Sequence, residues 1–406
     1  MALTPLASTT VTGSPTFYTG CTSEGTNQAL VVGYNGYVHQ YSLTTFVETS
    51  SSATLSNPSG IAMITPACAV IISSSVAQID FYQLSTGYIQ AITGTAGTSA
   101  KNQVIAGDVT TGTVMYVTNT ARTLVTVSSS FTTSSLTLRT GNTAYCAPIC
   151  VINKSSGRWL VGTDIGQIYE IDNVGNIYNT IEVNADNTQG LYASESGSAL
   201  IQYAVSNLAY DNNMLLVGMG DGTTYVYEYT TGTKVYQSQF KGTSQNNGIL
   251  FSVAASGEVA AIVGGTSWSN PGIPLFELDF TVKPLKVRDA IYTGSAIANP
   301  QDIGVNRNTG IGWFTGPTSG SVATIYFFSI TGVRATSLQT FTVPGNPICR
   351  LWLLDNTSGS TVGRPLLDVS MQSPATYRVP SGKTIIAAVQ VGDGESATYS
   401  GSQFNT

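Results

Sequence analysis

The sequence predicts an all-β protein in the form of a single β-propeller. One strand-pair motif returns seven times along the 406 residues, at intervals of 40 to 55 residues. Each copy has an apolar strand ending in Gly or a small residue, a short polar turn, and a strand that alternates apolar and polar side chains; Trp159–Asp172 is the clearest copy. No window shows the apolar spacing of a helix. A strand-only repeat of this length is typical of four-stranded sheets stacked around an axis.

The elements of each copy can be placed in order, because the second strand is the most apolar. Second strands are expected to begin near seven residues: Ala29, Ala69, Thr113, Trp159, Met214, Val259 and Ile311. Turns that end in Gly lie before the second strand, as in Thr110–Gly112, and between the last two strands, as in Thr230–Gly232. Gly permits the positive φ of a tight hairpin. Seven copies favour seven blades, and eight remain open.

The two ends of the chain do not follow the repeat. We expect residues 1–26 to form an arm that helps to close the ring, and residues 27–347 to form the blades. Residues 348–406 contain strand-like segments that are off the pattern, so they are expected to close the ring, form an eighth blade or extend from it for docking. Some closure is required, because an open ring leaves unpaired strand edges.

Composition excludes several classes of protein. Only 9% of residues are charged, the net charge is −6 and the predicted pI is near 4.8. These values argue against nucleic-acid binding, which needs a basic face. No apolar run approaches 18 residues, so no membrane span is expected, and the amino end does not resemble a secretory signal. Five cysteines in so long a chain indicate buried thiols made in a reducing cytoplasm.

Two segments of the sequence resemble known families. The segments Leu160–Asp172 and Met214–Tyr229 resemble the repeats of WD-type and quinoprotein-type propellers, and the similarity extends unevenly over residues 27–345. It implies a propeller in which bulky third-strand residues pack between blades. The Gly-His and Trp-Asp dipeptides of true WD repeats are missing. The segment Tyr377–Lys383 resembles a stretch common in phage and virion β-proteins.

Candidate chemistry is sparse. The single histidine, His39, is expected on a polar strand face, so an enzyme would have to use paired carboxylates, as glycosidases do. The candidate acids are Asp164, Asp211, Asp221, Glu228, Asp279 and Asp302. Asp164 and Asp221 are expected to be hairpin residues, and Glu170 and Glu228 exposed strand residues. Cys146 and Cys150 lack the partners of a zinc site. We therefore predict no catalytic residues, metal site or cofactor.

The best candidate surface comes from two insertions. One insertion, residues 184–197, lies between the fourth and fifth copies, and the other, residues 264–272, lies inside the sixth. In a four-stranded blade the connections of these two kinds emerge on one face. Exposed polar and aromatic side chains in such loops often bind partners or glycans. The predicted binding residues are Trp268, Asn270, Asp186, Asn187 and Tyr192.

These observations predict a non-enzymatic structural or interaction protein, a virion component such as a phage tail or decoration protein, assembled in the host cytoplasm. Its expected partners are other virion proteins or further copies of itself. Low charge suits a surface packed against neighbours. Two alternatives remain open: an adhesin that binds a surface glycan or receptor, and a carboxylate-based glycoside hydrolase.

Overall fold

We describe the fold from a computed structural model of the chain. The structure describes residues 3–10, 17–33, 36–53, 58–98, 103–119, 123–138, 147–183, 204–211, 213–219, 223–239, 250–253, 259–263, 275–279, 286–291, 302–317, 323–330, 336–343, 348–355, 367–380, 385–390 and 396–400. These residues form strands and turns, with no helix among them.

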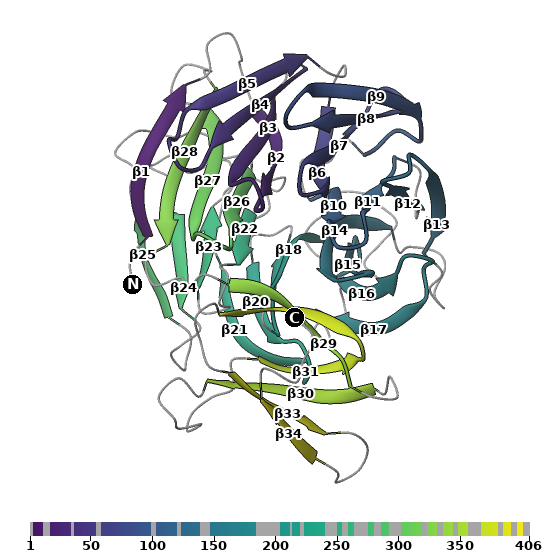
Figure 1. Ribbon diagram of the computed structural model, residues 1–406, viewed down its shortest axis with the longest axis vertical. Helices are drawn as coiled ribbons and strands as arrows, with labels where there is room; N and C mark the ends of the chain where they lie inside the picture. Colours follow the sequence, from purple (N-terminus) through teal and green to yellow (C-terminus); the bar gives the residue numbers. More distant parts are fainter. Residues whose placement is uncertain are drawn as a thin grey trace.

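Seven four-stranded antiparallel sheets follow one another around a central axis (Figure 1). Blades 1 to 4 each use four consecutive strands. Blade 1 contains β2 (Phe17–Ser23), β3 (Gln28–Gly33), β4 (Tyr37–Ser42) and β5 (Glu48–Ala53). Blade 2 contains β6 (Pro58–Thr65), β7 (Cys68–Ser73), β8 (Gln78–Gln83) and β9 (Gly87–Thr93). Blade 3 contains β10 (Ile105–Asp108), β11 (Thr113–Val117), β12 (Thr123–Ser128) and β13 (Thr133–Thr137). Blade 4 contains β14 (Pro148–Ser155), β15 (Arg158–Thr163), β16 (Gln167–Asp172) and β17 (Ile177–Glu182).

Blade 7 takes one strand from the other end of the chain. Blade 5 contains β18 (Val205–Asp211), β19 (Met214–Met219), β20 (Thr223–Glu228) and β21 (Thr233–Gln239). Blade 6 contains β22 (Leu250–Val253), β23 (Val259–Val263), β24 (Leu275–Asp279) and β25 (Lys286–Ile291). Blade 7 contains β26 (Asp302–Asn306), β27 (Ile311–Pro317), β28 (Ala323–Ile330) and, as its fourth strand, β1 (Leu3–Thr10).

Two kinds of strand contact close the ring. The inner strands β2, β6, β10, β14, β18, β22 and β26 contact one another in this order, and β26 contacts β2. The outer edge of blade 7 is completed by β1, which pairs antiparallel with β28 from Leu3↔Ile330 to Thr10↔Thr324. The first and last strands of the ring therefore share a sheet, which removes an edge that would otherwise be unpaired.

The remaining strands form a module beside the ring, drawn at the bottom of Figure 1. A two-stranded ribbon pairs β29 (Thr336–Phe341) with β32 (Ala375–Pro380). A four-stranded sheet has the order β31-β30-β33-β34, from Leu367–Gln372, Ile348–Asp355, Ile385–Gln390 and Ser396–Ser400. Its apolar residues Leu351, Leu353 and Val389 are buried, whereas Ile348 is exposed. The ribbon contacts β14, and none of these strands pairs with a blade.

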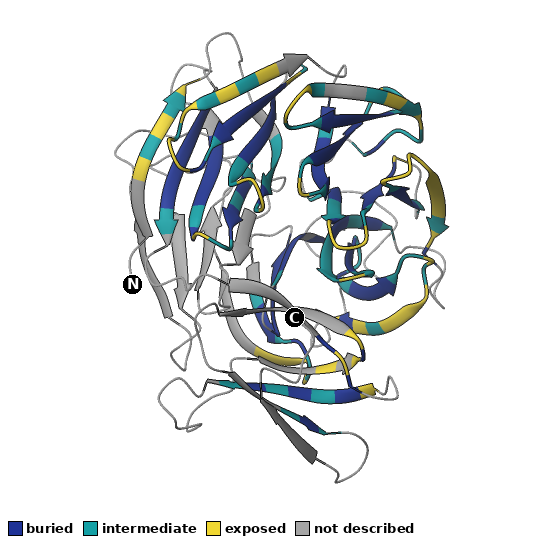
Figure 2. Cartoon of the chain, viewed as in Figure 1, coloured by how far each residue is buried: buried dark blue, intermediate teal, exposed yellow. Residues whose placement is uncertain are grey.

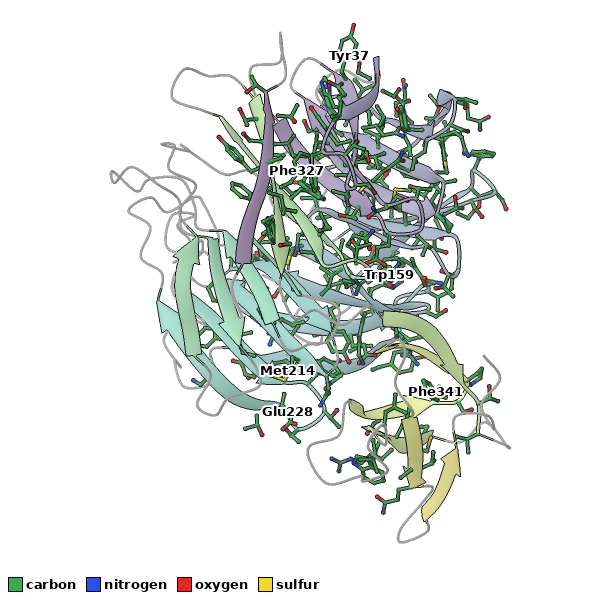
Figure 3. The ribbon with its side chains drawn as sticks, turned by 60° about the vertical axis from the view of Figure 1, so that its left-hand side comes forward. Tyr37, Trp159, Met214, Glu228, Phe327 and Phe341 are labelled. Carbon is green, nitrogen blue, oxygen red and sulfur yellow. The ribbon has the colours of Figure 1, made fainter. Side chains whose placement is uncertain are left out.

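The core of the propeller lies between neighbouring blades. Trp159 of blade 4 packs with Met115 and Leu124 of blade 3, and Trp313 of blade 7 packs with Tyr41 of blade 1. Both tryptophans are fully buried, and Figure 3 shows Trp159 inside the array. Their indole N–H groups donate to Asn173 Oδ1 at 2.6 Å and to Thr22 Oγ1 at 2.8 Å. Burial of such large aromatic faces is the main stabilising term of the stack.

The inner strands of neighbouring blades approach closely where one of them carries a glycine. A Cβ atom added to Gly107 of β10 would lie 1.8 Å from the carbonyl oxygen of Met63 on β6. Backbone cannot yield as a flexible side chain can, so the position requires glycine. This contact sets the spacing of blades 2 and 3.

The structure confirms the all-β propeller and places the second strands within a residue of their predicted starts. Four details differ from expectation. The blades begin at Phe17 of β2 rather than at residue 27, and β29 leaves the ring before residue 347. Glu170 is buried rather than exposed, because Tyr229 of blade 5 covers it and donates to its carboxylate, and His39, expected on a polar strand face, is also buried.

Candidate interaction surface

Because neighbouring strands of a blade run in opposite directions, the turns of each blade are divided between the two faces of the propeller. The turn between a blade's first and second strands and the turn between its third and fourth strands lie at one end, which we call the hairpin face. Six of the nine exposed large apolar side chains in the described part of the chain lie on this face or at its rim: Val47, Val109, Phe131, Val174, Ile177 and Tyr178. Figure 2 shows exposed segments at the turns of blades 3 and 4. A clustered set of this kind indicates a contact surface more strongly than scattered residues do.

Five of these side chains belong to blades 3 and 4. Together with Arg158 they form what we call the blade 3–4 patch: Val109, Phe131, Arg158, Val174, Ile177 and Tyr178. The turns of the two blades are neighbours, because Gly157 N donates to Asp108 Oδ2 at 2.7 Å. A Cβ added to Gly175 would lie 3.9 Å from Leu136 Cδ2 on β13. These contacts place the turns of blade 4 beside blade 3, whereas the Phe131 ring packs edge-on to Phe81 of blade 2, with 4.6 Å between ring centroids.

The β16–β17 turn holds its side chains in fixed positions. The Asp172 carboxylate accepts hydrogen bonds from Val174 N at 2.9 Å, from Asn176 N at 2.9 Å and Nδ2 at 2.8 Å, and from Tyr178 Oη at 3.1 Å. Gly175 supplies the positive φ of 90° that the turn needs. The turn is thus built to leave Val174, which is 71% exposed, in solvent.

This network also sets the charge of the turn. Partial burial would raise the pKa of Asp172, but the hydrogen bonds from Asn176, Val174 and Tyr178 outweigh it and lower the pKa. Asp172 therefore remains a carboxylate that its own turn satisfies.

Arg158 is the cation of the patch. Its guanidinium carbon lies 3.2 Å from the centroid of the Tyr178 ring, a stacked cation–π contact. The Nη1 atom is buried from solvent, and the described residues offer it no hydrogen-bond acceptor. Because Nη1 is buried, this donor is not accessible to a partner.

A buried polar network lies between blades 4 and 5. Lys154 Nζ lies 2.9 Å from Glu170 Oε1 and 4.1 Å from the centroid of the Tyr229 ring, and the Tyr229 hydroxyl donates to Glu170 Oε2. Burial lowers the pKa of Lys154 although Glu170 opposes the shift, and burial together with the Glu170 charge raises the pKa of Tyr229. Both oxygens of Glu170 are occupied, so the network joins blade 4 to blade 5.

Comparisons with known proteins agree with the architecture. No protein-family model matches the chain, and no curated protein is significantly similar to it in sequence. Among solved structures, the β-propeller domain of Myceliophteria thermophila Cps50 (Swd1) has a TM-score of 0.55 and 11% sequence identity; the match covers 81% of this chain and all of that domain. The chain is a β-propeller. At this level of identity the likeness concerns the fold alone.

The predicted acids lie apart in the propeller and bind its backbone. Asp164 Oδ1 accepts from Ala147 N at 2.8 Å, before β14, and Asp302 Oδ2 accepts from Gly20 N at 2.8 Å, between blades 7 and 1. Glu228 lies near the Thr231 hydroxyl in blade 5, and Figure 3 shows it at the margin. Asp221 and the side chains of Asp211 and Asp279 lie outside the described residues. The acids that can be placed belong to different blades and do not meet in one site.

The single histidine and four of the five cysteines lie within the described part of the fold. His39 Nδ1 lies 2.8 Å from Glu48 Oε1 within blade 1. Cys68, Cys150 and Cys349 are buried free thiols, Cys21 is a partly buried free thiol, and Cys146 lies outside the described residues. Within the described residues, no three His, Cys, Asp or Glu side chains group as a metal site requires. The described residues contain no helix long and apolar enough to cross a membrane.

The five predicted binding residues, Trp268, Asn270, Asp186, Asn187 and Tyr192, all lie outside the described residues. Their segments follow β23 and β17, whose ends lie on the face opposite the hairpin face. The blade 3–4 patch was missed in the sequence. A signal does exist: Val174 stands at the tip of a turn of otherwise polar residues, and Ile177 and Tyr178 follow at once.

Proposed function

We propose that this propeller is a non-enzymatic interaction protein that assembles with other protein subunits, as a structural component of a virion such as a tail or decoration protein. The observation that carries the proposal is the blade 3–4 patch, where a preformed turn keeps apolar side chains in solvent. A monomer gains nothing from such exposure, whereas an interface core is built from such residues.

Two further observations support assembly over catalysis. Asp164, Asp302 and Glu170 each bind backbone amides or a buried ion-pair network, which are structural tasks. Charged residues make up only 9% of the chain, as expected for a surface that is largely covered by neighbours. The virion assignment rests on this composition and on the resemblance of Tyr377–Lys383 to virion β-proteins.

Fractionation of the source cells or particles on a density gradient tests the proposal. An antibody against the chain is expected to detect it in the high-mass particle fractions, and the signal should persist at high salt, because an apolar interface is weakly screened. A soluble protein of similar mass serves as the control. Recovery of the chain only as a free monomer would contradict the proposal.

A further inference from the structure

The outer strand of blade 3, β13, differs from every other outer strand that the structure describes in the ring. In the other six blades the pairing of the outer strand is interrupted, and the extra residue lies in the outer strand itself; these strands are β1, β5, β9, β17, β21 and β25. The pairing of β12 with β13 runs from Thr123↔Thr137 to Val127↔Thr133 without interruption. A β-bulge twists an edge away from approaching strands, so β13 lacks this protection.

Charge and proline, which also protect strand edges, are absent from β13 as well. Its sequence is Thr-Ser-Ser-Leu-Thr, whereas β5, β17, β21 and β25 each carry a charged residue and β1 carries Pro5. Four of the five residues of β13 are exposed, and only Leu136 is half-buried. Figure 2 shows the strand mostly in yellow at the margin of the ring. β13 is therefore a flat, uncharged and open strand edge.

The hydrogen bonds of the blade decide which backbone groups β13 leaves unpaired. Ser128 N donates to Thr132 O at 2.9 Å, which makes these two residues a bonded pair. Bonded pairs recur at every second residue of an antiparallel ladder, so the residues between them point their N–H and C=O groups away from β12. In β13 these are Thr133, Ser135 and Thr137, and the described part of the chain places no strand beside them.

We propose that β13 pairs antiparallel with β13 of a second copy of this chain, around a two-fold axis at Ser135. Ser135 of one copy exchanges both backbone hydrogen bonds with Ser135 of the other, and Thr133 exchanges both with Thr137. Blade 3 of the two copies then forms one continuous sheet. This register uses every outward-pointing backbone group of the strand.

The composition of β13 favours a second copy as the occupant. A two-fold axis sets a residue near the axis against its own counterpart, so a charge there would repel itself. β13 has no charge, and Thr and Ser form stabilising pairs across strands. This chain already fills one outer place with a strand remote in sequence, since β1 pairs with β28. The proposal goes beyond the function proposed above, because the pairing needs neither a virion nor the blade 3–4 patch.

Sedimentation equilibrium of the full-length chain over a concentration series tests the proposal. The wild type is expected to show a monomer–dimer equilibrium. Ser135→Lys should weaken the dimer by at least about fivefold, because two like charges then face each other across the axis. Ser135→Pro should abolish it, because proline removes the outward N–H without removing a hydrogen bond of the blade. A wild type that is monomeric at every concentration would overturn the proposal.

The matched control is Ser51→Lys, at an exposed position of the bulged outer strand β5. It adds the same charge to a different edge and should leave the dimer unchanged. If Ser51→Lys weakens the dimer as much as Ser135→Lys does, the effect is one of net charge and the proposal is wrong.

A mixture of two variants separates strand pairing from an indirect effect on folding. Ser135→Lys and Ser135→Glu should each dimerise weakly alone, whereas an equimolar mixture should recover the dimer, because opposite charges then meet across the axis. Circular dichroism and thermal unfolding check that each variant folds. A mixture that stays monomeric while the wild type dimerises, or a dimer that persists in every variant, would place the interface elsewhere.

The particle fractions distinguish this proposal from the proposed function. If the purified chain is monomeric but Ser135→Lys is lost from the particle fractions, β13 pairs with a strand of a different protein and a second copy is the wrong occupant. A monomeric chain that fractionates with particles keeps the proposed function and loses this inference. A β13 dimer that never joins a particle gives the reverse result.

Discussion

At the scale of single residues, polar side chains join the blades at their seams. Asp302 begins β26 and accepts hydrogen bonds from Gly20 N, from Thr19 Oγ1 at 3.1 Å and from its neighbour Ile303 N at 2.8 Å. It therefore connects the inner strand of blade 7 to that of blade 1. Glu24 and Arg307 form an ion pair of 2.8 Å across the same seam. Such contacts specify which blades are neighbours, since a half-satisfied polar group would be costly.

The titration of Asp302 gives a test at this scale. Burial raises its pKa from 3.8 to about 6, although the hydrogen bonds from Gly20, Ile303 and Thr19 oppose the shift. The folded chain then holds more protons than the unfolded chain between these values, so this group lowers the free energy of unfolding as pH rises from about 4 to about 6. The change is on the order of 3 kcal/mol. Denaturant unfolding across this range should show a steeper fall in the wild type than in Asp302→Asn. Parallel curves would contradict the assignment.

At the scale of elements, β1 decides whether blade 7 is complete. Its seven register pairs with β28 cover an edge, and its Ala7 packs beside the buried cluster of Trp313 and Phe327. Every other blade takes its fourth strand from the segment that follows its third. The ring is thus held by pairing between residues more than 300 positions apart in sequence.

Deletion of residues 1–10 should leave β28 as an exposed strand edge. We expect a lower thermal unfolding midpoint and aggregation that light scattering detects, because unpaired edges template association. A synthetic peptide of residues 1–10 should restore part of the midpoint by pairing in trans. Deletion of residues 401–406 serves as the control and should have little effect. An unchanged midpoint after the amino-terminal deletion would show that β1 does not close the ring.

At the scale of the whole molecule, the chain divides into a closed ring and a side module. The ring is complete without any strand after β28, since β1 fills the last place. The side module has its own buried residues, including Phe341, Val343 and Cys349, and touches the ring through β32 and β14. The blade 3–4 patch therefore belongs to the ring, on blades whose strands are consecutive in sequence.

A chain that ends at residue 335 is expected to fold as the intact propeller. Its thermal midpoint should fall only slightly, because among the described residues the side module touches the ring mainly through β32 and β14. Far-ultraviolet circular dichroism and thermal scans measure this. Loss of cooperative unfolding in this truncated chain would mean that the side module is part of the ring's core.

Sequence alone determined the all-β class, the propeller of four-stranded blades and the starts of the second strands. These features depend on local spacing of apolar residues and on Gly turns, which can be seen within about 50 residues. Only the tertiary structure decided that β1 completes blade 7, that Glu170 and His39 are buried, and that Arg158 faces Tyr178 beside exposed Val174. Each of these depends on which surface a neighbouring strand or blade covers, and a pattern of period two cannot specify its neighbour.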